Sequence, residues 1–131
     1  MRKQNAYVLH IDVQRPLTLR AGALQGACLP AGRYVYVGSA RTAMAARIAR
    51  HVRLATQKTG KLRWHIDYLL THPQTQLTGA TVLADSNECR ISLQIASRKG
   101  VTAPISHFGS TDCRSGCKAH LYRLQARLAS L

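Results

Sequence analysis

Alternation of apolar and polar positions defines the first ordered segment of the chain. In residues 6–13 the larger apolar side chains occupy every second position, as Tyr7, Leu9, Ile11 and Val13. Side chains at every second position of a β-strand point to the same face of the sheet. The segment is therefore predicted to be a strand with one buried face.

Three more strands are predicted in the first third of the chain. Short apolar runs at residues 17–19 and 24–29 lie on either side of a glycine turn, and a Pro-Ala-Gly turn follows them. In the next segment Tyr34, Tyr36 and Gly38 alternate, which places both phenols on one face. The glycine lets another group approach the backbone closely. These segments predict an antiparallel sheet of three or four strands.

At Thr42 the apolar period changes to about 3.6 residues, which predicts a helix. At about 100° per residue, one stripe gathers the apolar side chains Met44, Ile48, Val52 and Ala55. Arg47 and His51, four residues apart, lie at the border between this stripe and solvent. Arg50 and Arg53 point away from the stripe, so we expect them to be solvated.

The rest of the chain predicts two helices and two strands. The helices are expected at residues 64–72 and from residue 85 to about 99, with a proline and a glycine as stop signals. The strands are expected at residues 76–84 and 120–124. Residues 1–131 are thus predicted to form one α+β domain, a small antiparallel sheet flanked by helices.

Two pairs of residues in the 64–72 helix have simple interpretations. Trp64 and Tyr68, four residues apart, are expected in the core. His65 and Asp67, two residues apart, point to different sides of a helix and do not form a ready-made catalytic dyad.

The net charge of the chain indicates which class of partner to expect. The chain carries 19 Lys and Arg against five Asp and Glu, a formal net charge of +14. Such a charge attracts polyanions, and salt weakens the attraction, so nucleic acid is the expected partner. A membrane is not expected, because no basic amphipathic face gathers the arginines and no apolar run approaches about 18 residues.

The chain has four cysteines: Cys28, Cys89, Cys113 and Cys117. The first residues lead directly into a strand pattern, so we expect no export signal, a cytoplasmic location and reduced thiols. The last two cysteines and His120 could furnish three zinc ligands, with Cys89 or His107 as a fourth. The tighter Cys-x2-Cys spacing is absent, so zinc is not favoured over packed or exposed thiols.

Tyr36, Arg47 and His51 supply groups that phosphate chemistry needs. A guanidinium binds phosphate with two parallel hydrogen bonds. Either Tyr36 or His51 could accept a proton from water, although a tyrosine would need its pKa of about 10 lowered by nearby cations. The same spacing also describes an ordinary amphipathic helix with basic flanks.

These residues resemble the signature of the GIY-YIG endonucleases. Asn5-Ala6-Tyr7 is similar to the first half of that signature, with asparagine in place of the usual glycine. Tyr36-Val37-Gly38, followed by Arg47 and His51, is similar to the second half. The chain also resembles the small stand-alone Uri-like branch of this superfamily in three segments, residues 30–41, 64–70 and 108–113.

The resemblance implies a metal-dependent endonuclease that hydrolyses phosphodiester bonds in nucleic acid, with DNA preferred, as in DNA repair or processing. The catalytic residues that it implies are Tyr7, Tyr36, Arg47 and His51. Ser39 and Arg41 would contact the nucleic-acid backbone, and the solvent-facing Arg50 is counted with them. Ser39 stands where some relatives carry a lysine, which removes one aid to proton abstraction.

Glu88, the only glutamate in the chain, has two interpretations. Three residues after Asp85, it fits a capping box at the start of the third helix. The resemblance favours a metal ligand, because the superfamily carries its metal-binding glutamate on a helix after the arginine-bearing one. The expected ion is Mg²⁺ or Mn²⁺. The alternative function is a non-catalytic nucleic-acid-binding module with the same fold.

Overall fold

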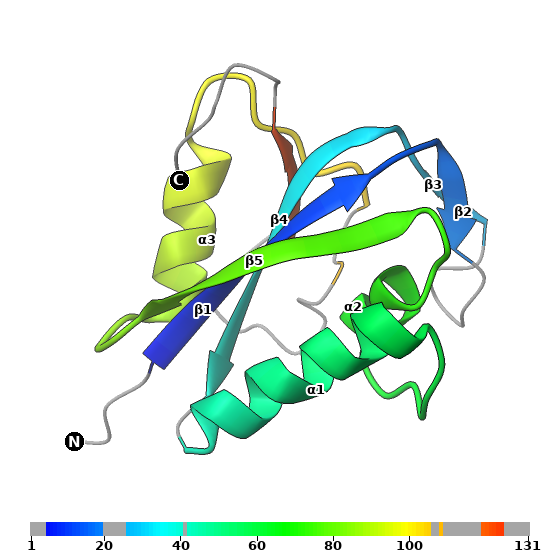
Figure 1. Ribbon diagram of the computed structural model, residues 1–131. Helices are drawn as coiled ribbons and strands as arrows, with labels where there is room; N and C mark the ends of the chain where they lie inside the picture. The colour runs from blue at the N-terminus through cyan, green and yellow to red at the C-terminus, as the bar shows by residue number, and fades with distance from the viewer. Residues whose placement is uncertain (1–4, 20–25, 41, 106–107, 109–118, 125–131) are drawn as a thin grey trace.

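A computed structural model of the chain describes residues 5–19, 26–40, 42–105, 108 and 119–124. The structure is α+β, as the sequence predicts, with a sheet flanked by helices (Figure 1). Its elements are, in chain order, β1 (Asn5–Val13), β2 (Leu17–Leu19), β3 (Ala27–Leu29), β4 (Gly32–Ala40), α1 (Met44–Gln57), α2 (His65–Leu70), β5 (Thr75–Leu83), α3 (Glu88–Ala96) and β6 (Leu121–Leu124).

The main sheet has four antiparallel strands in the order β5-β1-β4-β6. The pairing of β1 with β4 places Tyr7 opposite Gly38 and Leu9 opposite Tyr36. The two short strands, β2 and β3, pair with each other in a separate sheet. The main sheet is instead completed by β5 and β6, which come from the second half of the chain.

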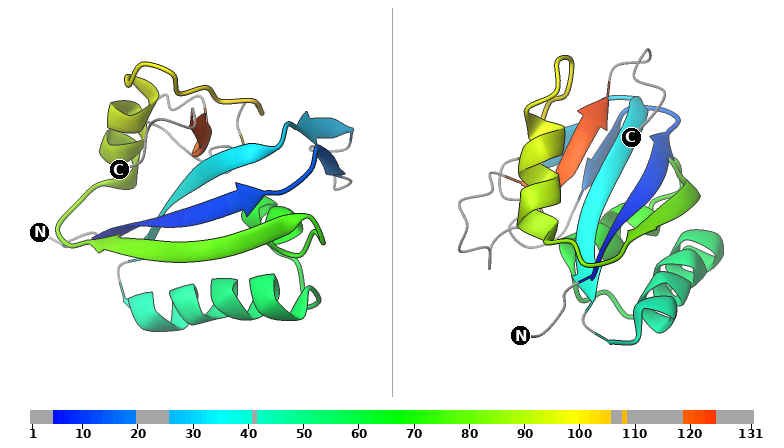
Figure 2. Two further views of the ribbon diagram at one scale, coloured as in Figure 1. Left: turned by 45° about the horizontal axis from the view of Figure 1, so that its top comes forward. Right: turned by 90° about the vertical axis from the view of Figure 1, so that its left-hand side faces the viewer.

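Helices cover both faces of the main sheet (Figure 2). On one face Tyr7, Leu9 and Tyr36 share a core with residues of α1 and α2, namely Leu54, Ile66, Leu69 and Leu70. On the other face Val8, Val35 and Val37 pack with Ile95 of α3. Because side chains alternate along a strand, β1 and β4 each contribute residues to both cores.

Three residues of the predicted apolar stripe of α1, Met44, Ile48 and Ala55, pack against the core as predicted, but Val52 does not. Val52 is 46% exposed, whereas His51 and Leu54 are buried. The helix is rotated relative to the prediction because Leu54 enters the core and His51 bonds to the sheet. The predicted position of His51, at the border between core and solvent, is therefore wrong.

The helix at α2 is shorter than predicted, and its preceding residue is not in the core. Trp64 lies just before the helix and is 38% exposed, so its predicted core position is wrong. Tyr68 is half-buried and packs against the core, as predicted. The two residues differ because Trp64 lies outside the helix, where the four-residue spacing no longer sets its direction.

The first turn of α3 is capped by Asn87. The side chain of Asn87 accepts hydrogen bonds from the backbone N–H groups of Cys89 (2.9 Å) and Arg90 (3.2 Å). Glu88 is therefore the first residue of the helix, and Asp85 lies before the cap. The capping-box interpretation of Glu88 is wrong, because that motif needs the glutamate three residues after the cap.

Gly38 permits the close approach of Tyr7 across the sheet. A Cβ added at Gly38 would lie 2.5 Å from the hydroxyl oxygen of Tyr7 and 2.8 Å from its Cε1. We therefore expect Gly38→Ala to lower the free energy of unfolding by about 1–3 kcal/mol, as overpacking does. Chemical denaturation measures the difference.

Gly79→Ala, on β5 of the same sheet, is the matched control. A Cβ at Gly79 would meet its nearest neighbour, Cδ2 of His10, at 3.8 Å, which is an ordinary contact. Its destabilisation should be smaller than that of Gly38→Ala. Equal stabilities for both variants would contradict the prediction.

Candidate active site

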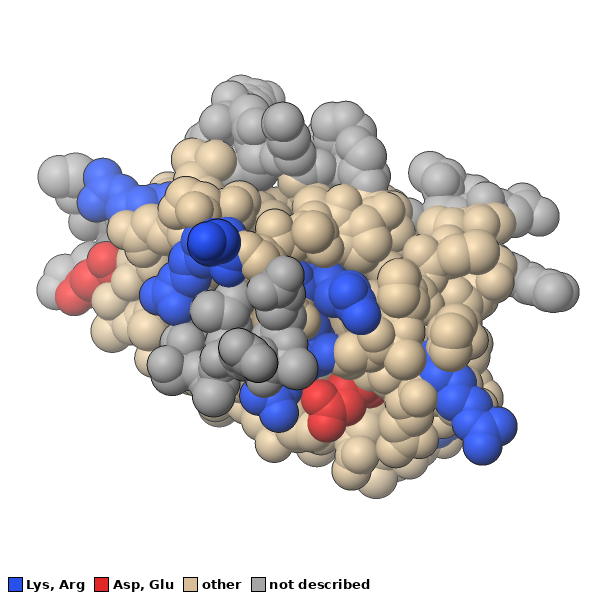
Figure 3. Space-filling model, turned by 90° about the horizontal axis from the view of Figure 1, so that it is seen from above, with Lys and Arg blue, Asp and Glu red and all other residues tan. Residues whose placement is uncertain are grey.

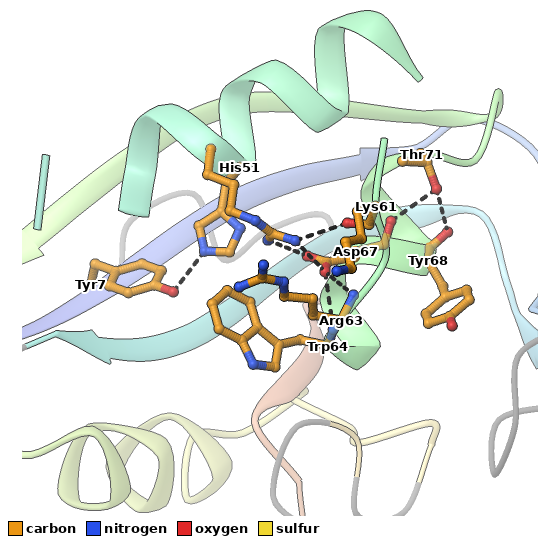
Figure 4. Close-up of polar contacts among 9 residues, drawn as sticks. Tyr7, His51, Lys61, Arg63, Trp64, Asp67, Tyr68 and Thr71 are labelled. Atoms are coloured by element: carbon orange, nitrogen blue, oxygen red, sulfur yellow. Dashed lines mark hydrogen bonds and ion pairs between the residues drawn. The ribbon is translucent and has the colours of Figure 1, made fainter. Parts of the chain in front are cut away.

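A buried hydrogen bond joins β1 to α1. The phenol oxygen of Tyr7 and Nε2 of His51 are 2.7 Å apart, and their ring centroids are separated by 5.5 Å (Figure 4). Both side chains are buried. Strand alternation directs Tyr7 toward α1, and the rotation of α1 directs His51 toward the sheet. The fold thus joins a phenol and an imidazole that lie far apart in sequence.

Burial shifts both partners toward their neutral forms. It raises the pKa of Tyr7 to about 12, against the opposing effect of the Arg47 guanidinium beside the phenol. It lowers the pKa of His51 to about 4, against the opposing negative charge of Asp67. At neutral pH the pair is a neutral phenol and a neutral imidazole. Nδ1 of His51 is buried and has no hydrogen-bond partner among the described residues.

Tyr36 lies beside Tyr7 on the same face of the sheet. Its ring meets Phe108 edge to face, with 6.2 Å between the centroids. Burial raises the pKa of Tyr36, and nearby negative charge adds to the effect. The lowered pKa that Tyr36 would need as a general base is therefore not found. The position lines the site instead.

Asp67 is a buried carboxylate that ties α1 to the start of α2. It accepts two hydrogen bonds of 2.9 Å from the guanidinium of Arg50. It also accepts the backbone N–H groups of Arg63 (2.7 Å) and Trp64 (3.0 Å) (Figure 4). Burial alone would raise the pKa of Asp67, but these hydrogen bonds outweigh it and lower the pKa. The ionised carboxylate holds the segment before α2 in place.

Trp64 lies under two arginines of α1. The Cζ atoms of Arg47 and Arg50 are 4.9 Å and 4.7 Å from the centroid of its ring. Such cation–π contacts are worth about 0.5–1 kcal/mol at exposed sites and restrict the guanidinium. Arg50 is paired with Asp67, whereas Arg47 forms no ion pair with a carboxylate in the described part of the chain. The Arg47 guanidinium also lies beside the Tyr7 phenol, where it acts to lower the pKa of Tyr7.

Glu88 belongs to the helix on the opposite face, yet its charge reaches the two phenols. After burial, which is the largest cause, the carboxylate of Glu88 contributes to raising the pKa of Tyr7 and of Tyr36. The Glu88 side chain is 31% exposed, and its Oε2 lies 3.7 Å from Nδ1 of His120. The Glu88 carboxylate is thus accessible, and its negative charge affects the pKa values of both phenols.

The structure brings together four of the predicted residues: Tyr7, Tyr36, Arg47 and His51. Ser39 lies on the other face of β4, with Val37, because side chains alternate along the strand. Arg41 lies outside the described residues. The predicted solvated position of Arg50 is wrong, because its guanidinium neutralises the buried Asp67.

Asn5 has a structural partner that the sequence did not indicate. Its side-chain oxygen accepts a hydrogen bond of 3.0 Å from the backbone N–H of Asp85. This contact ties the start of β1 to the loop that leads into α3. Asn5 therefore helps to position the loop before the helix that carries Glu88.

The motif with zinc-ligand spacing falls mainly outside the described residues. His107, Cys113 and Cys117 are among the undescribed positions, whereas Cys89 and His120 are in contact, with 4.0 Å between Sγ and Nε2. In the described part of the chain no three His, Cys, Asp or Glu side chains group to hold a metal ion.

Sequence reasoning misses Asp67 and Trp64 as parts of the site. A signal for Asp67 is present, because it is one of only five acidic residues and lies among the apolar residues Ile66, Leu69 and Leu70. An acid in that place of a basic protein indicates a buried cationic partner. The partners of Trp64 are remote in sequence, and no local pattern indicates them.

Basic side chains are spread over the face of the molecule that is seen from above in Figure 3. On the face shown in Figure 3, Lys and Arg occupy several separate places with uncharged residues between them. On this face the described basic side chains do not form one continuous track.

The fold and the site define an α+β domain with a buried Tyr–His pair next to an arginine on an aromatic ring. Comparison with known families matches residues 6–130 to the family described as "Domain of unknown function DUF123". The chain belongs to this family. Comparisons with curated proteins and with solved structures gave no match. None of the described helices is long and apolar enough to cross a membrane.

Acid is expected to destabilise the fold through His51. The folded pKa of about 4 lies below the ordinary 6.5, so the unfolded state takes up the proton first. The contribution of His51 to the free energy of unfolding is complete above pH 6.5. As the pH falls toward 4, this contribution is lost, and the free energy of unfolding decreases by about 3 kcal/mol. Unfolding free energies measured across this range should show the loss in the native protein.

His51→Gln should remove this part of the acid dependence, because glutamine does not titrate. His10→Gln is the control, since it replaces a half-buried histidine that bonds to Thr81 and leaves His51 in place. The same acid dependence in the native protein and in His51→Gln would contradict the assignment.

Proposed function

We propose that this protein is a metal-dependent endonuclease that hydrolyses phosphodiester bonds in nucleic acid, with DNA preferred to RNA. The observation that carries the proposal is the buried hydrogen bond between Tyr7 and His51. Next to it lies Arg47, held over Trp64. The resemblance to the GIY-YIG endonucleases supports the same roles. We place the activity in the cytoplasm, in DNA repair or processing.

The Tyr7–His51 pair can move a proton away from an attacking water. In the tautomer with its proton on Nδ1, His51 accepts the phenol proton at Nε2 while the Tyr7 oxygen accepts a proton from water. The phenol then never exists as a free phenolate, which its pKa of about 12 disfavours. Burial disfavours the resulting imidazolium, and the negative charge of Asp67 opposes that effect.

Arg47 acts on the phosphate as the water oxygen bonds to phosphorus and the bond to the leaving oxygen breaks. The leaving oxygen takes a proton from solvent, and His51 releases the proton that it received. Its guanidinium can donate two hydrogen bonds to the phosphate oxygens, and these strengthen as negative charge develops. The stacking on Trp64 orients the guanidinium before the substrate arrives. Trp64 is therefore a positioning residue.

Glu88 is the residue that would hold a divalent ion. Its carboxylate is accessible at the start of α3, and its charge is felt at Tyr7 and Tyr36. Mg²⁺ is often held by one or two carboxylates, with water and substrate phosphate completing its coordination. When bound, such an ion offsets negative charge on the phosphate and on the leaving oxygen.

A cleavage assay tests the proposal directly. Duplex, single-stranded and branched DNA and the corresponding RNA are incubated with the protein in Mg²⁺, in Mn²⁺ or in EDTA. We expect cleavage of DNA that needs a divalent ion. Binding without cleavage in every condition would contradict the proposal.

Arg47→Ala should lower kcat by about 10²–10³-fold, as the loss of one transition-state donor does. The affinity for nucleic acid should change little, because many other basic residues remain. Arg53→Ala is the matched control, an exposed arginine on the same helix, and should retain native kcat. Native kcat with a collapse in affinity would make Arg47 a binding residue only.

The second candidate is a nucleic-acid-binding module without turnover. The net charge of +14 and the raised pKa of Tyr7 favour it. Contact with ~5 phosphates predicts a slope of log K against log salt near roughly −4 on duplex DNA. Both candidates share this slope, so only the cleavage assay separates them.

A further inference from the structure

The contact between Glu88 and His120 is not used by the chemistry proposed above. His120 comes directly before β6, where its carbonyl accepts from Val37 N–H (2.9 Å) and its N–H donates to the carbonyl of Phe108 (2.8 Å). The backbone of His120 is therefore held in place through both its carbonyl and its N–H group. The imidazole is buried and faces Glu88 across 3.7 Å, from Nδ1 to Oε2.

We propose that His120 is a second protein ligand of the divalent ion held by Glu88, through Nδ1, and that Cys89 orients the ring. The inference rests on the proposed function for the role of Glu88. It adds a nitrogen ligand, and with it a preference for Mn²⁺, Co²⁺ or Zn²⁺ over Mg²⁺.

The distance between the two groups supports a shared ion. At 3.7 Å the imidazole and the carboxylate are too far apart for a hydrogen bond to each other. Two ligands that each lie about 2.1 Å from a metal ion are about 3.0–3.6 Å apart for angles of 90–120°. A shift of a few tenths of an ångström in the accessible Glu88 side chain brings both groups to an ion.

The other side of the ring supports the assignment of Nδ1 as the ligand atom. Nε2 of His120 is 4.0 Å from Sγ of Cys89, the residue after Glu88. Metal-binding histidines usually direct their second ring nitrogen to an acceptor, which fixes the tautomer and the ring orientation. With its proton on Nε2, facing the thiol, the imidazole presents a lone pair at Nδ1 toward Glu88.

An ion held by these two side chains would have positions left for other groups. Glu88 and His120 would supply two of its ligands. Water and a substrate phosphate can fill the others, as an ion that meets substrate requires.

Metal binding without nucleic acid tests the inference. The full chain is titrated with Co²⁺, Zn²⁺, Mn²⁺ and Mg²⁺ by calorimetry, and the Co²⁺ complex is followed by its visible absorption. We expect the native protein to bind Co²⁺ and Zn²⁺ more tightly than Mg²⁺. His120→Ala should weaken Co²⁺ and Zn²⁺ binding by at least roughly 10-fold and leave Mg²⁺ binding nearly unchanged.

Two further variants separate the roles. Cys89→Ala should weaken Co²⁺ binding by about 10-fold through loss of ring orientation. His10→Ala, which removes a half-buried histidine that bonds to Thr81, should bind Co²⁺ as the native protein does. Native Co²⁺ affinity and an unchanged spectrum in His120→Ala would overturn the inference.

A measurement on the native protein keeps the inference testable if His120→Ala does not fold. In a ¹⁵N-histidine-labelled sample, Zn²⁺ should shift the Nδ1 signal of His120, and an unmoved signal would overturn the inference. These readouts are independent of turnover. A protein that binds Zn²⁺ through His120 but cleaves nothing would contradict the proposed function alone, whereas metal-dependent cleavage without His120 binding would contradict the inference alone.

Discussion

Replacing Tyr7 by phenylalanine is expected to lower the rate of phosphodiester cleavage by about 10²–10⁴-fold, the contribution of a general base or proton relay. The substitution keeps the ring that packs against Gly38 and removes only the hydroxyl that bonds to Nε2 of His51. The water then has no route by which its proton reaches the imidazole. Single-turnover cleavage with protein in excess measures the chemical step directly.

The control for this prediction is Tyr34→Phe. Tyr34 is also buried in the sheet, but its hydroxyl donates to the carbonyl of Pro30, away from His51. Both variants lose a buried hydroxyl and one hydrogen bond, at a cost of about 1–3 kcal/mol in stability. Only Tyr7→Phe should lose turnover. Equal rates in the two variants would remove Tyr7 from the chemistry.

Glu88→Gln should abolish metal-dependent cleavage while the protein still folds and binds nucleic acid. An amide is a far weaker ligand for a divalent ion than a carboxylate, because it carries no negative charge. Stability should fall by no more than about 1 kcal/mol, the usual worth of an acidic side chain in the first turn of a helix. Calorimetric titration with Mn²⁺, a cleavage assay and thermal unfolding report the three properties separately.

Asp85→Asn is the matched control for Glu88→Gln. Asp85 is an exposed acid on the loop just before α3 and has a left-handed backbone, with φ of 53°, that asparagine tolerates well. It should bind Mn²⁺ and cleave DNA at the native rate. A Glu88→Gln protein that cleaves at the native rate would end the metal-site hypothesis and favour the binding module.

The positions of the strands and helices could be predicted because they depend on local patterns. Alternation identified β1 and β4, the apolar run identified β5, and the helical period placed α1 close to its observed bounds. The boundaries of α2 and α3 were less accurate, because capping depends on one or two side chains. The spacing of the sequence predicted Asp85 as the residue that caps α3. In the structure the cap is Asn87.

The buried face of α1 shows why the site was harder to predict than the elements. A hydropathy pattern assigns His51 to the helix border because imidazole is polar. In the fold the ring is buried, since the Tyr7 hydroxyl offers it a hydrogen bond from the sheet. Arg50 likewise looked solvated until the buried Asp67 supplied its partner. Each polar group could be buried only with a partner that is remote in sequence.

The sequence by itself determined the α+β class, the strand and helix positions, the strong positive charge and the candidate residues Tyr7, Tyr36, Arg47, His51 and Glu88. These follow from local periodicity, composition and resemblance. Only the tertiary structure decided that Tyr7 pairs with His51, that Asp67 and Trp64 hold the arginines, and that Glu88 faces His120. Such pairings depend on strand register, helix rotation and burial, which no local stretch of the chain encodes.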